Sequence, residues 1–309
     1  MNLCVQNGGT TGHFDKQTCY RLIKEAGFSS IDLNIDTCFN QNVLKDHMNE
    51  GKTPYEKGVE GIKAFYHEDL EAIKDNGLYI YQCHAPFPAY RPDAKEGYLD
   101  YCIEAYKTAL DFCKEVGCGR MVVHGVSLAR TNFKDTQKDI DAINEHLYTS
   151  LIEKAKETGV LVLLENLFTG YDGSIREGHC TNEYEAVAYI DHLNELAGCE
   201  CFGICVDTGH LNLLGKNQYK YITTLGKRIK AFHIHDNDGM RDLHLAPYTG
   251  TVNWEDFCNG VRDAGYDGDL SFETFRQYTP ARYVDNRVLA PWLNLVAAVG
   301  KVFIEKIEG

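Results

Sequence analysis

The chain has 309 residues, of which 44% are hydrophobic and 25% charged, so it can bury a large core as ordinary globular proteins do. Its formal net charge of -14 argues against a strong surface for nucleic acid or anionic membrane, because phosphate groups require a local excess of cations. The 12 cysteines are scattered without a Cys-x-x-Cys pair, which favours reduced thiols and a cytoplasmic protein.

Apolar runs of strand character alternate with helical patterns along the whole chain. The predicted strands cover residues 3–5, 30–35, 78–83, 121–125, 160–164, 204–207, 229–235 and 269–272, and the predicted helices 14–26, 61–76, 98–116, 138–158, 182–197, 219–227, 253–264 and 289–306. Residues 36–60 are polar and irregular, so we expect a long loop there. Eight such units without a break in composition predict a single-domain α/β protein over residues 1–309, a (β/α)8 TIM barrel. A doubly wound open sheet is the alternative, but no glycine-rich phosphate loop follows the first strand.

Several of the predicted strands end in a carboxylate or an imidazole. These residues are His84, His124, Glu165, Asp207 with His210, His233 with His235, and Glu273. In a barrel the carboxyl ends of all strands meet at one face, so these side chains are expected to form a ring. A ring of acids and histidines without matching Lys or Arg would repel itself, and a divalent cation removes that repulsion. Mixed Asp, Glu and His donors suit Mn²⁺, Zn²⁺, Co²⁺ or Mg²⁺.

Each of these residues also has an ordinary structural explanation. A single histidine at a strand end is commonly a hydrogen-bonded core residue, and Asp207 before Thr208 and Gly209 has the position of a helix N-cap. The coincidence of several such residues at one rim favours a metal. Of the two histidines in the seventh strand, His233 is the preferred ligand over His235 because it lies deeper in the strand.

The segment after the seventh strand carries further polar residues. Asp242 and His244 could add a second metal-binding pair, and a solvated loop is the equal alternative. The nearby Arg241 could contact a substrate hydroxyl or phosphate.

Four of these stretches together resemble the xylose-isomerase-like barrel superfamily, which contains sugar isomerases and epimerases and the endonuclease-IV-type nucleases. They are LLEN at Glu165, VDTGH at Asp207 and His210, FHIHDND at His233, and SFET at Glu273, and the resemblance spans essentially the whole chain. The epimerase branch implies that Glu165, Asp207, His233 and Glu273 hold one divalent metal ion. It also implies that the two glutamates transfer protons and that His210 contacts the substrate.

The nuclease branch implies extra ligands for three zinc ions. Its HAP motif matches at His84, its second histidine at His124, and its D-x-H motif at Asp242 and His244, with His210 as a further candidate ligand. Two features depart from that branch. The VVHG stretch at His124 lacks the proline that usually follows the nuclease histidine, and the acidic chain shows no obvious basic face for DNA.

The sequence therefore favours a metal-dependent isomerase or epimerase for a sugar or sugar phosphate. Glu165 and Glu273 would remove and return a proton beside a carbonyl through a metal-stabilised ene-diolate. The same site could serve a dehydratase or a lyase that cleaves carbon glycosides. The second hypothesis is a zinc phosphodiesterase acting at abasic DNA, and the third is a binding barrel without catalysis. The expected partner is a small sugar or sugar derivative, with nucleic acid disfavoured and a homo-oligomer left open. A membrane partner is not expected, because no window approaches about 18 uninterrupted apolar residues.

Overall fold

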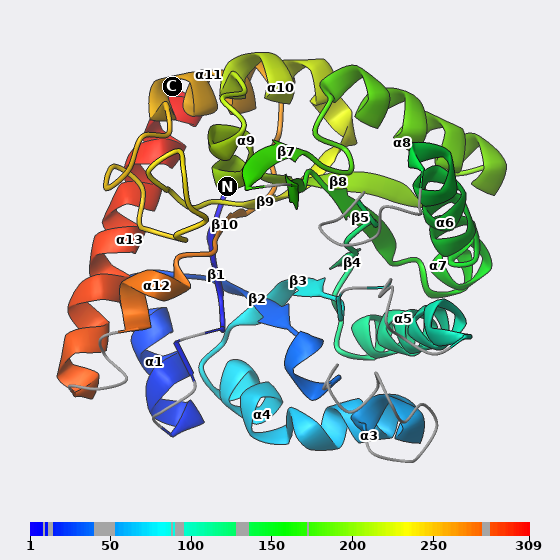
Figure 1. The fold of residues 1–309 in the computed structure, drawn as a ribbon. Coiled ribbons are helices and arrows are strands. Elements are labelled where there is room, and N and C mark those ends of the chain that lie inside the picture. The colour runs from blue at the N-terminus through cyan, green and yellow to red at the C-terminus, as the bar shows by residue number, and fades with distance from the viewer. Residues whose placement is uncertain are drawn as a thin grey trace. The chain divides into compact units, whose positions relative to one another are not determined.

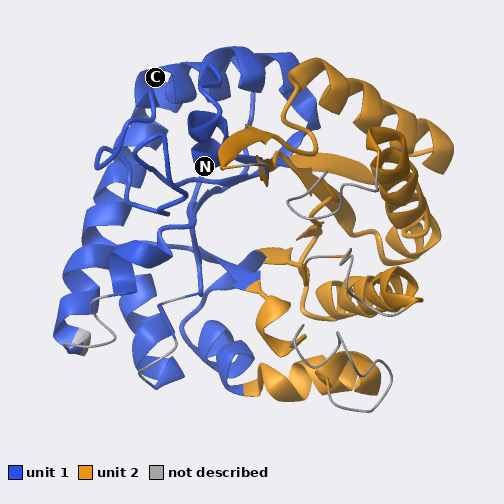
Figure 2. Cartoon of the chain, viewed as in Figure 1, with its two compact units in different colours: residues 1–33, 68–81, 205–309 blue, residues 34–67, 82–204 orange. Residues whose placement is uncertain are grey.

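The computed structural model describes residues 1–8, 10–11, 15–39, 53–87, 89, 96–127, 136–171, 173–279 and 285–309. The chain divides into two compact units (Figure 2). Unit 1 consists of Met1–Leu33, Glu68–Tyr81 and Cys205–Gly309, and unit 2 of Asn34–His67 and Gln82–Ile204. The boundaries cut through three strands, β2 (Ser30–Asn34) at its last residue, β3 (Tyr79–His84) and β8 (Phe202–Asp207), so each of these strands contributes to both units.

Unit 1 contains parallel strands in the order β9 (Ile229–His233), β10 (Leu270–Phe272), β1 (Leu3–Gln6) and β2 (Ser30–Asn34). Cys4 pairs with Ser271 of β10 on one side and with Ser30 of β2 on the other, and an isolated bridge joins Ile234 to Phe272. The first half of β3 continues the sheet, since the Tyr79 N–H donates to the Ser29 carbonyl over 3.3 Å. These strands are buried, as expected for a parallel sheet covered by helices.

Unit 2 continues the pattern with the second half of β3, followed by β4 (Arg120–Val122), β5 (Leu161–Glu165) and the first half of β8. Cys83 pairs with Met121, and Met121 pairs with Val162. The Val162 N–H then donates to the Cys201 carbonyl over 2.9 Å. The eight-fold alternation of strand and helix that the sequence predicts is therefore confirmed.

The helices follow the predicted pattern with local differences (Figure 1). They are α1 (Lys16–Ala26), α3 (Gly58–Phe65), α4 (His67–Asp75), α5 (Tyr98–Glu115), α6 (Gln137–Thr149), α7 (Ile152–Thr158), α8 (Glu183–Ala197), α9 (Thr208–Leu213), α10 (Gln218–Leu225), α11 (Trp254–Ala264), α12 (Phe275–Tyr278) and α13 (Asn286–Glu308). Two predicted long helices are each divided in two, at Tyr66 and at residues 150–151. The predicted caps Asn182 and Asn253 are confirmed, because each side chain accepts backbone N–H groups of its helix.

The expected long loop at 36–60 is only partly irregular. Short 3-10 helices occupy η1 (Asp36–Cys38) and η2 (Pro54–Lys57), and α3 begins at Gly58. Residues 40–52 lie outside the described residues. A further 3-10 turn, η3 (Gly226–Arg228), precedes β9. The sequence did not predict the antiparallel hairpin of β6 (Phe168–Tyr171) and β7 (Ser174–Glu177), which follows β5.

The C-terminal helix α13 closes the core of unit 1. It lies beside α1 (Figure 1), and its buried Phe303 ring packs against Trp254, Phe257 and Phe272 at centroid distances of 5.1, 5.6 and 6.3 Å. By length and composition alone the stretch Arg287–Glu308 could cross a membrane. That is weak evidence, because a core helix of a soluble protein passes the same test.

Candidate metal centre

Three donors of unit 1 converge at the carboxyl ends of its strands. Asp207 is the last residue of β8, His233 is the last residue of β9, and Glu273 follows β10 directly. All three are buried, and one ligand atom from each lies within 4.8 Å of the other two. Burying two carboxylates beside an imidazole is costly unless a cation or hydrogen bonds compensate them. The set therefore has the composition and spacing of a divalent-metal site.

Asp207 has two tasks. Its Oδ1 accepts the His210 N–H over 2.7 Å and caps α9, as its position before Thr208 and Gly209 suggested. Its Oδ2 lies 3.0 Å from His235 Nε2 and 3.7 Å from His210 Nδ1. The capping oxygen is therefore engaged with backbone, while the other oxygen faces the imidazoles.

His233 is held between two carboxylates. Its Nε2 lies 3.3 Å from Asp32 Oδ2, and its Nδ1 lies 3.8 Å from Glu273 Oε2. The Gln6 side-chain amide donates to Glu273 Oε1, which leaves Oε2 on the His233 side. Because a carboxylate beside one ring nitrogen fixes the tautomer and orientation of a metal-binding histidine, Asp32 favours Nδ1 of His233 as the metal-facing atom.

Asp32 and Gln6 are site residues that the sequence did not predict. A signal for Asp32 was available, since it stands between Ile31 and Leu33 in a strand and so faces the opposite side from those two residues. Asp32 is fully buried and Gln6 is 3% exposed.

A second group of donors in unit 1 surrounds His235. Its ligand atoms come within 4.8 Å of those of Asp207 and His210, and also of those of His244 and Glu273. The His235 and His244 rings stack at 3.9 Å. Burial disfavours protonation of His235, but the carboxylates of Asp207, Asp242 and Glu273 outweigh it and raise its pKa.

Asp242 joins this group from the loop that follows β9. Asp242 Oδ2 lies 3.0 Å from His244 Nε2, and the carboxylate reaches His210 and His235 at 4.0 Å. Burial alone would raise the pKa of Asp242, but the hydrogen bond to His244 and the nearby imidazoles lower it. Asp242 and His244 therefore lie among the other donors of unit 1 and are not part of a freely solvated loop.

The buried Asp236 anchors this loop. Its carboxylate accepts the N–H groups of Gly250 and Val252 over 3.0 Å and the Trp254 indole N–H over 3.1 Å. These bonds close the loop back on the end of β9 and place residues 242–244 beside it.

Arg241, predicted to contact substrate, pairs with Asp238 in the structure. Its guanidinium makes two hydrogen bonds to Asp238, of 2.9 and 2.7 Å, and its side chain is 72% exposed.

Unit 2 brings together the other three predicted donors. His124 Nε2 lies 3.0 Å from both His84 Nε2 and Glu165 Oε2, and His84 Nε2 lies 3.6 Å from the same Glu165 oxygen. Glu165 and His84 are 2% and 3% exposed. His84 Nδ1 is 2.9 Å from the Ala85 carbonyl, which marks Nδ1–H as the donor and leaves Nε2 directed at the cluster.

These groups of carboxylate and imidazole donors are chemically suited to a divalent cation. Within the described part of the chain, His235 Nδ1 and Asp242 Oδ1 are buried and make no hydrogen bond. Such atoms are normally satisfied in folded proteins, so a bound ion or substrate is a natural partner for them.

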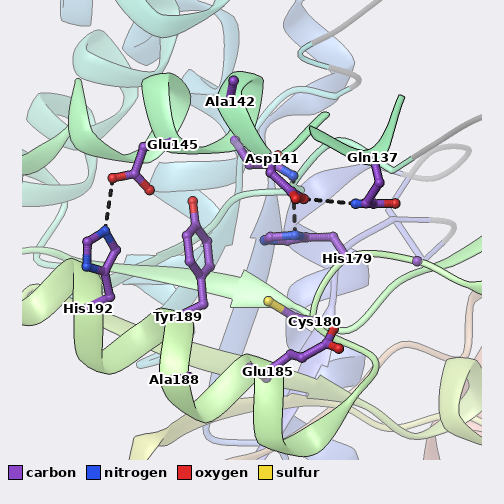
Figure 3. A pocket seen from close by; sticks show the side chains of 13 residues that line it. Gln137, Asp141, Ala142, Glu145, His179, Cys180, Glu185, Ala188, Tyr189 and His192 are labelled. Atoms are coloured by element: carbon purple, nitrogen blue, oxygen red, sulfur yellow. Dashed lines mark hydrogen bonds and ion pairs between the residues drawn. The ribbon is translucent and has the colours of Figure 1, made fainter. Parts of the chain in front are cut away.

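A cavity of about 670 Å³ in unit 2 shares no residue with these donors (Figure 3). It is lined by parts of α6 and α8 and by residues 178–180. His192 and Glu145 pair across it at 3.0 Å, and the Asn144 amide donates to His179 Nδ1 over 3.3 Å. Burial lowers the pKa of His179 to about 4.

Comparisons with known proteins identify a matching family and several related enzymes. Residues 20–291 match the model of a family described as the xylose isomerase-like TIM barrel, which confirms the predicted fold. The inosose isomerase of Bacillus velezensis is 23% identical over 282 residues, covering 89% of each protein. The ketose 3-epimerase of Arthrobacter globiformis is 27% identical over 145 residues, 47% of this chain and 45% of that protein.

Solved structures share the fold over the whole chain. The crystal structure of the IOLI protein with a zinc atom matches with a TM-score of 0.68 at 17% identity, covering 100% of this chain and 98% of that one. At this identity the likeness concerns the fold.

Proposed function

The chain belongs to the xylose isomerase-like TIM barrel family, and we propose that it is a divalent-metal-dependent isomerase or epimerase for a sugar or sugar derivative. The observation that carries the proposal is the convergence of Asp207, His233 and Glu273 at the strand ends of unit 1. Relatives that are named as a ketose 3-epimerase and an inosose isomerase support the class of reaction.

We propose that Asp207, His233 and Glu273 hold the metal ion and that Glu165 is the fourth ligand, as the sequence motifs predict. The zinc atom bound by the IOLI protein supports a divalent ion, and Mn²⁺, Co²⁺ and Mg²⁺ stay open. When bound, the ion would polarise a substrate carbonyl and acidify the neighbouring C–H.

The two glutamates would move the proton. An ordinary glutamate, with a pKa of about 4.3, is a weak base, so it works only on an acidified C–H. Gln6 holds Glu273 Oε1 by a hydrogen bond and so fixes the orientation of this carboxylate. Glu165 would act on the opposite side of the substrate. His210, and in a rearranged loop Arg241, would contact substrate hydroxyls.

Solvent isotope exchange tests this proposal directly. The purified protein is loaded with Mn²⁺ in D₂O and incubated with a panel of ketohexoses and inososes. Deuterium is expected at the carbon beside the carbonyl, and Glu165→Gln is expected to abolish the exchange. Glu177→Gln, on the exposed hairpin of the same unit, is the matched control and should exchange like the parent. Undiminished exchange in Glu165→Gln would reject Glu165 as a base.

Chelation tests the metal requirement separately. Exhaustive EDTA treatment should abolish the exchange, and Mn²⁺ or Co²⁺ should restore it. Full activity after chelation would remove the metal from the proposal. Product analysis in the same experiment distinguishes epimerisation from elimination, since a dehydratase or lyase would yield an unsaturated or cleaved product.

One observation favours a second candidate, a multi-zinc phosphodiesterase. His84, His124 and Glu165 form a second compact donor set, and His210, Asp242 and His244 lie close together in unit 1. Metal analysis after zinc loading decides between them, because three ions per chain would favour the nuclease-type site and one ion the epimerase type. Cleavage of an abasic duplex would confirm the nuclease.

We also propose a cytoplasmic location. All 12 cysteines are free thiols in the structure, including the pair Cys199 and Cys201, whose sulfurs lie 3.2 Å apart. Reduced thiols in such proximity persist in a reducing compartment.

A further inference from the structure

Three cysteine sulfurs meet inside unit 2. They belong to Cys83 on β3, Cys113 in the last turn of α5, and Cys118 in the turn before β4. The three sulfur atoms all lie within 4.8 Å of one another, and the residues are 0%, 0% and 1% exposed. We call them the thiol cluster.

The local fold explains how the sulfurs come together. Gly117, at φ 73°, turns the chain sharply at the end of α5, and the Cys118 N–H then donates to the Cys113 carbonyl over 2.8 Å. Strand pairing of Cys83 with Met121 brings β3 alongside the segment that follows Cys118. Because successive strand residues face opposite sides, Cys83 points away from the side of His84. The thiol cluster is therefore separate from the imidazole cluster of His84, His124 and Glu165.

The surroundings of Cys118 favour loss of its proton more than those of the other two thiols do. Burial acts to raise the pKa of Cys118, but hydrogen bonds from the Cys113 and Cys83 thiols, and the nearby Arg120 guanidinium, lower it. The hydrogen bond to Cys118 in turn raises the pKa of Cys113. Cys118 is therefore expected to be the first of the three thiols to lose its proton when a soft cation binds.

The number and spacing of the sulfurs select the kind of ion. With a metal–sulfur bond of about 2.3 Å, a flat three-coordinate ion places its sulfurs about 4.0 Å apart, which the thiol cluster can meet with small shifts. Structural zinc requires four ligands, and the thiol cluster offers three among the described residues. Soft thiolates without a fourth ligand suit monovalent copper.

We propose that Cys83, Cys113 and Cys118 form a buried three-sulfur site for Cu(I). Three S–H bonds break, three protons leave to solvent, and three Cu–S bonds form, with no change in the oxidation state of copper or sulfur. The product carries two net negative charges, and Arg120 lies where it offsets part of them. Nothing in this site depends on the proposed isomerase activity.

The test uses the full chain with Cys199→Ser and Cys201→Ser, which removes the other pair of neighbouring thiols. Reduced protein is titrated without oxygen against the coloured Cu(I)–bicinchoninate complex until the absorbance is constant. The protein should take one equivalent of copper that bicinchoninate does not remove. A new ultraviolet thiolate-to-copper band should appear with it. X-ray absorption at the copper edge should then show three sulfur neighbours at about 2.3 Å.

Two variants locate the site. Cys118→Ala should bind no copper at the same bicinchoninate concentration and should show no ultraviolet band. Cys102→Ala is the matched control, because Cys102 is equally buried on α5 but outside the thiol cluster, and it should retain both. If Cys118→Ala fails to fold, the X-ray absorption spectrum of the parent decides alone. No bound copper, or nitrogen and oxygen neighbours in place of three sulfurs, would overturn the proposal.

Discussion

His179 should make the protein sensitive to acid, by an amount that follows from its surroundings. Burial lowers the pKa of its imidazole from 6.5 to about 4. The ring is stacked against Tyr148 at 5.7 Å and accepts a hydrogen bond from Asn144 at Nδ1, so the neutral form is the one that fits. Between pH 6.5 and about 4, His179 therefore binds a proton in the unfolded chain but not in the folded chain.

The sign and size follow from proton linkage. The folded pKa lies below the unfolded one, so this contribution is fully present above pH 6.5 and is lost as the pH falls toward 4. The gap from 6.5 to about 4 corresponds to at most about 3.4 kcal/mol at about 1.36 kcal/mol per pH unit, of which about 2.5 kcal/mol is lost by pH 4.5. This value is an upper limit, because His179 keeps part of its surface in solvent.

Urea unfolding at pH 7.5 and at pH 4.5, with EDTA present, measures this contribution. His179→Gln keeps an acceptor for Asn144 but cannot titrate, so it should lose about 2.5 kcal/mol less stability between the two pH values than the parent does. The control is His192→Gln on the same cavity, where the imidazole is 48% exposed and pairs with Glu145. Equal losses in the parent and in His179→Gln would refute the reasoning, whatever their stabilities at pH 7.5.

Three further predictions concern the metal site and the core. Asp32→Asn should weaken metal affinity about 10- to 100-fold in a chelator competition, because Asp32 orients His233, and unchanged affinity would exclude that role. Phe303→Ala should lower the free energy of unfolding by about 3 to 5 kcal/mol, since its buried ring contacts four other aromatic rings, whereas Val302→Ala, 41% exposed, should cost little. Asn253→Ala should cost about 1 kcal/mol in the same assay through loss of the α11 cap, and no change would mean that water replaces it.

The elements that the sequence predicts well are those whose pattern is set by burial. Parallel strands covered on both faces require apolar runs, so β5 and β8 were visible as strands, and the polar residues that end them stood out. The β6–β7 hairpin carries no such requirement, since β7 is exposed along its length. Its signal was the turn sequence before Ser174, where Gly173 has a φ of 75°.

Residues that act through others are harder to find from sequence. Asp32 matters because it touches His233, and that contact joins β2 to β9, which are far apart in the chain. The thiol cluster has the same character, because its three cysteines are ordinary buried residues until β3, α5 and the turn at Gly117 bring the sulfurs together. In both cases the function depends on contacts that form only when the chain folds, and neither hydrophobic periodicity nor residue spacing reveals these contacts.

Asp207 shows why an ordinary structural role does not exclude a functional one. The capping and metal-binding interpretations are compatible, because a carboxylate has two oxygens and α9 uses only Oδ1. Capping fixes the side-chain torsion, and Oδ2 is thereby held toward His235 and His210 at no further entropic cost. Asp207→Asn should therefore retain the cap through its amide oxygen while losing one anionic donor. We expect it to keep the free energy of unfolding within about 1 kcal/mol but to lose metal affinity, and a variant that binds metal normally would show that Asp207 is only a cap.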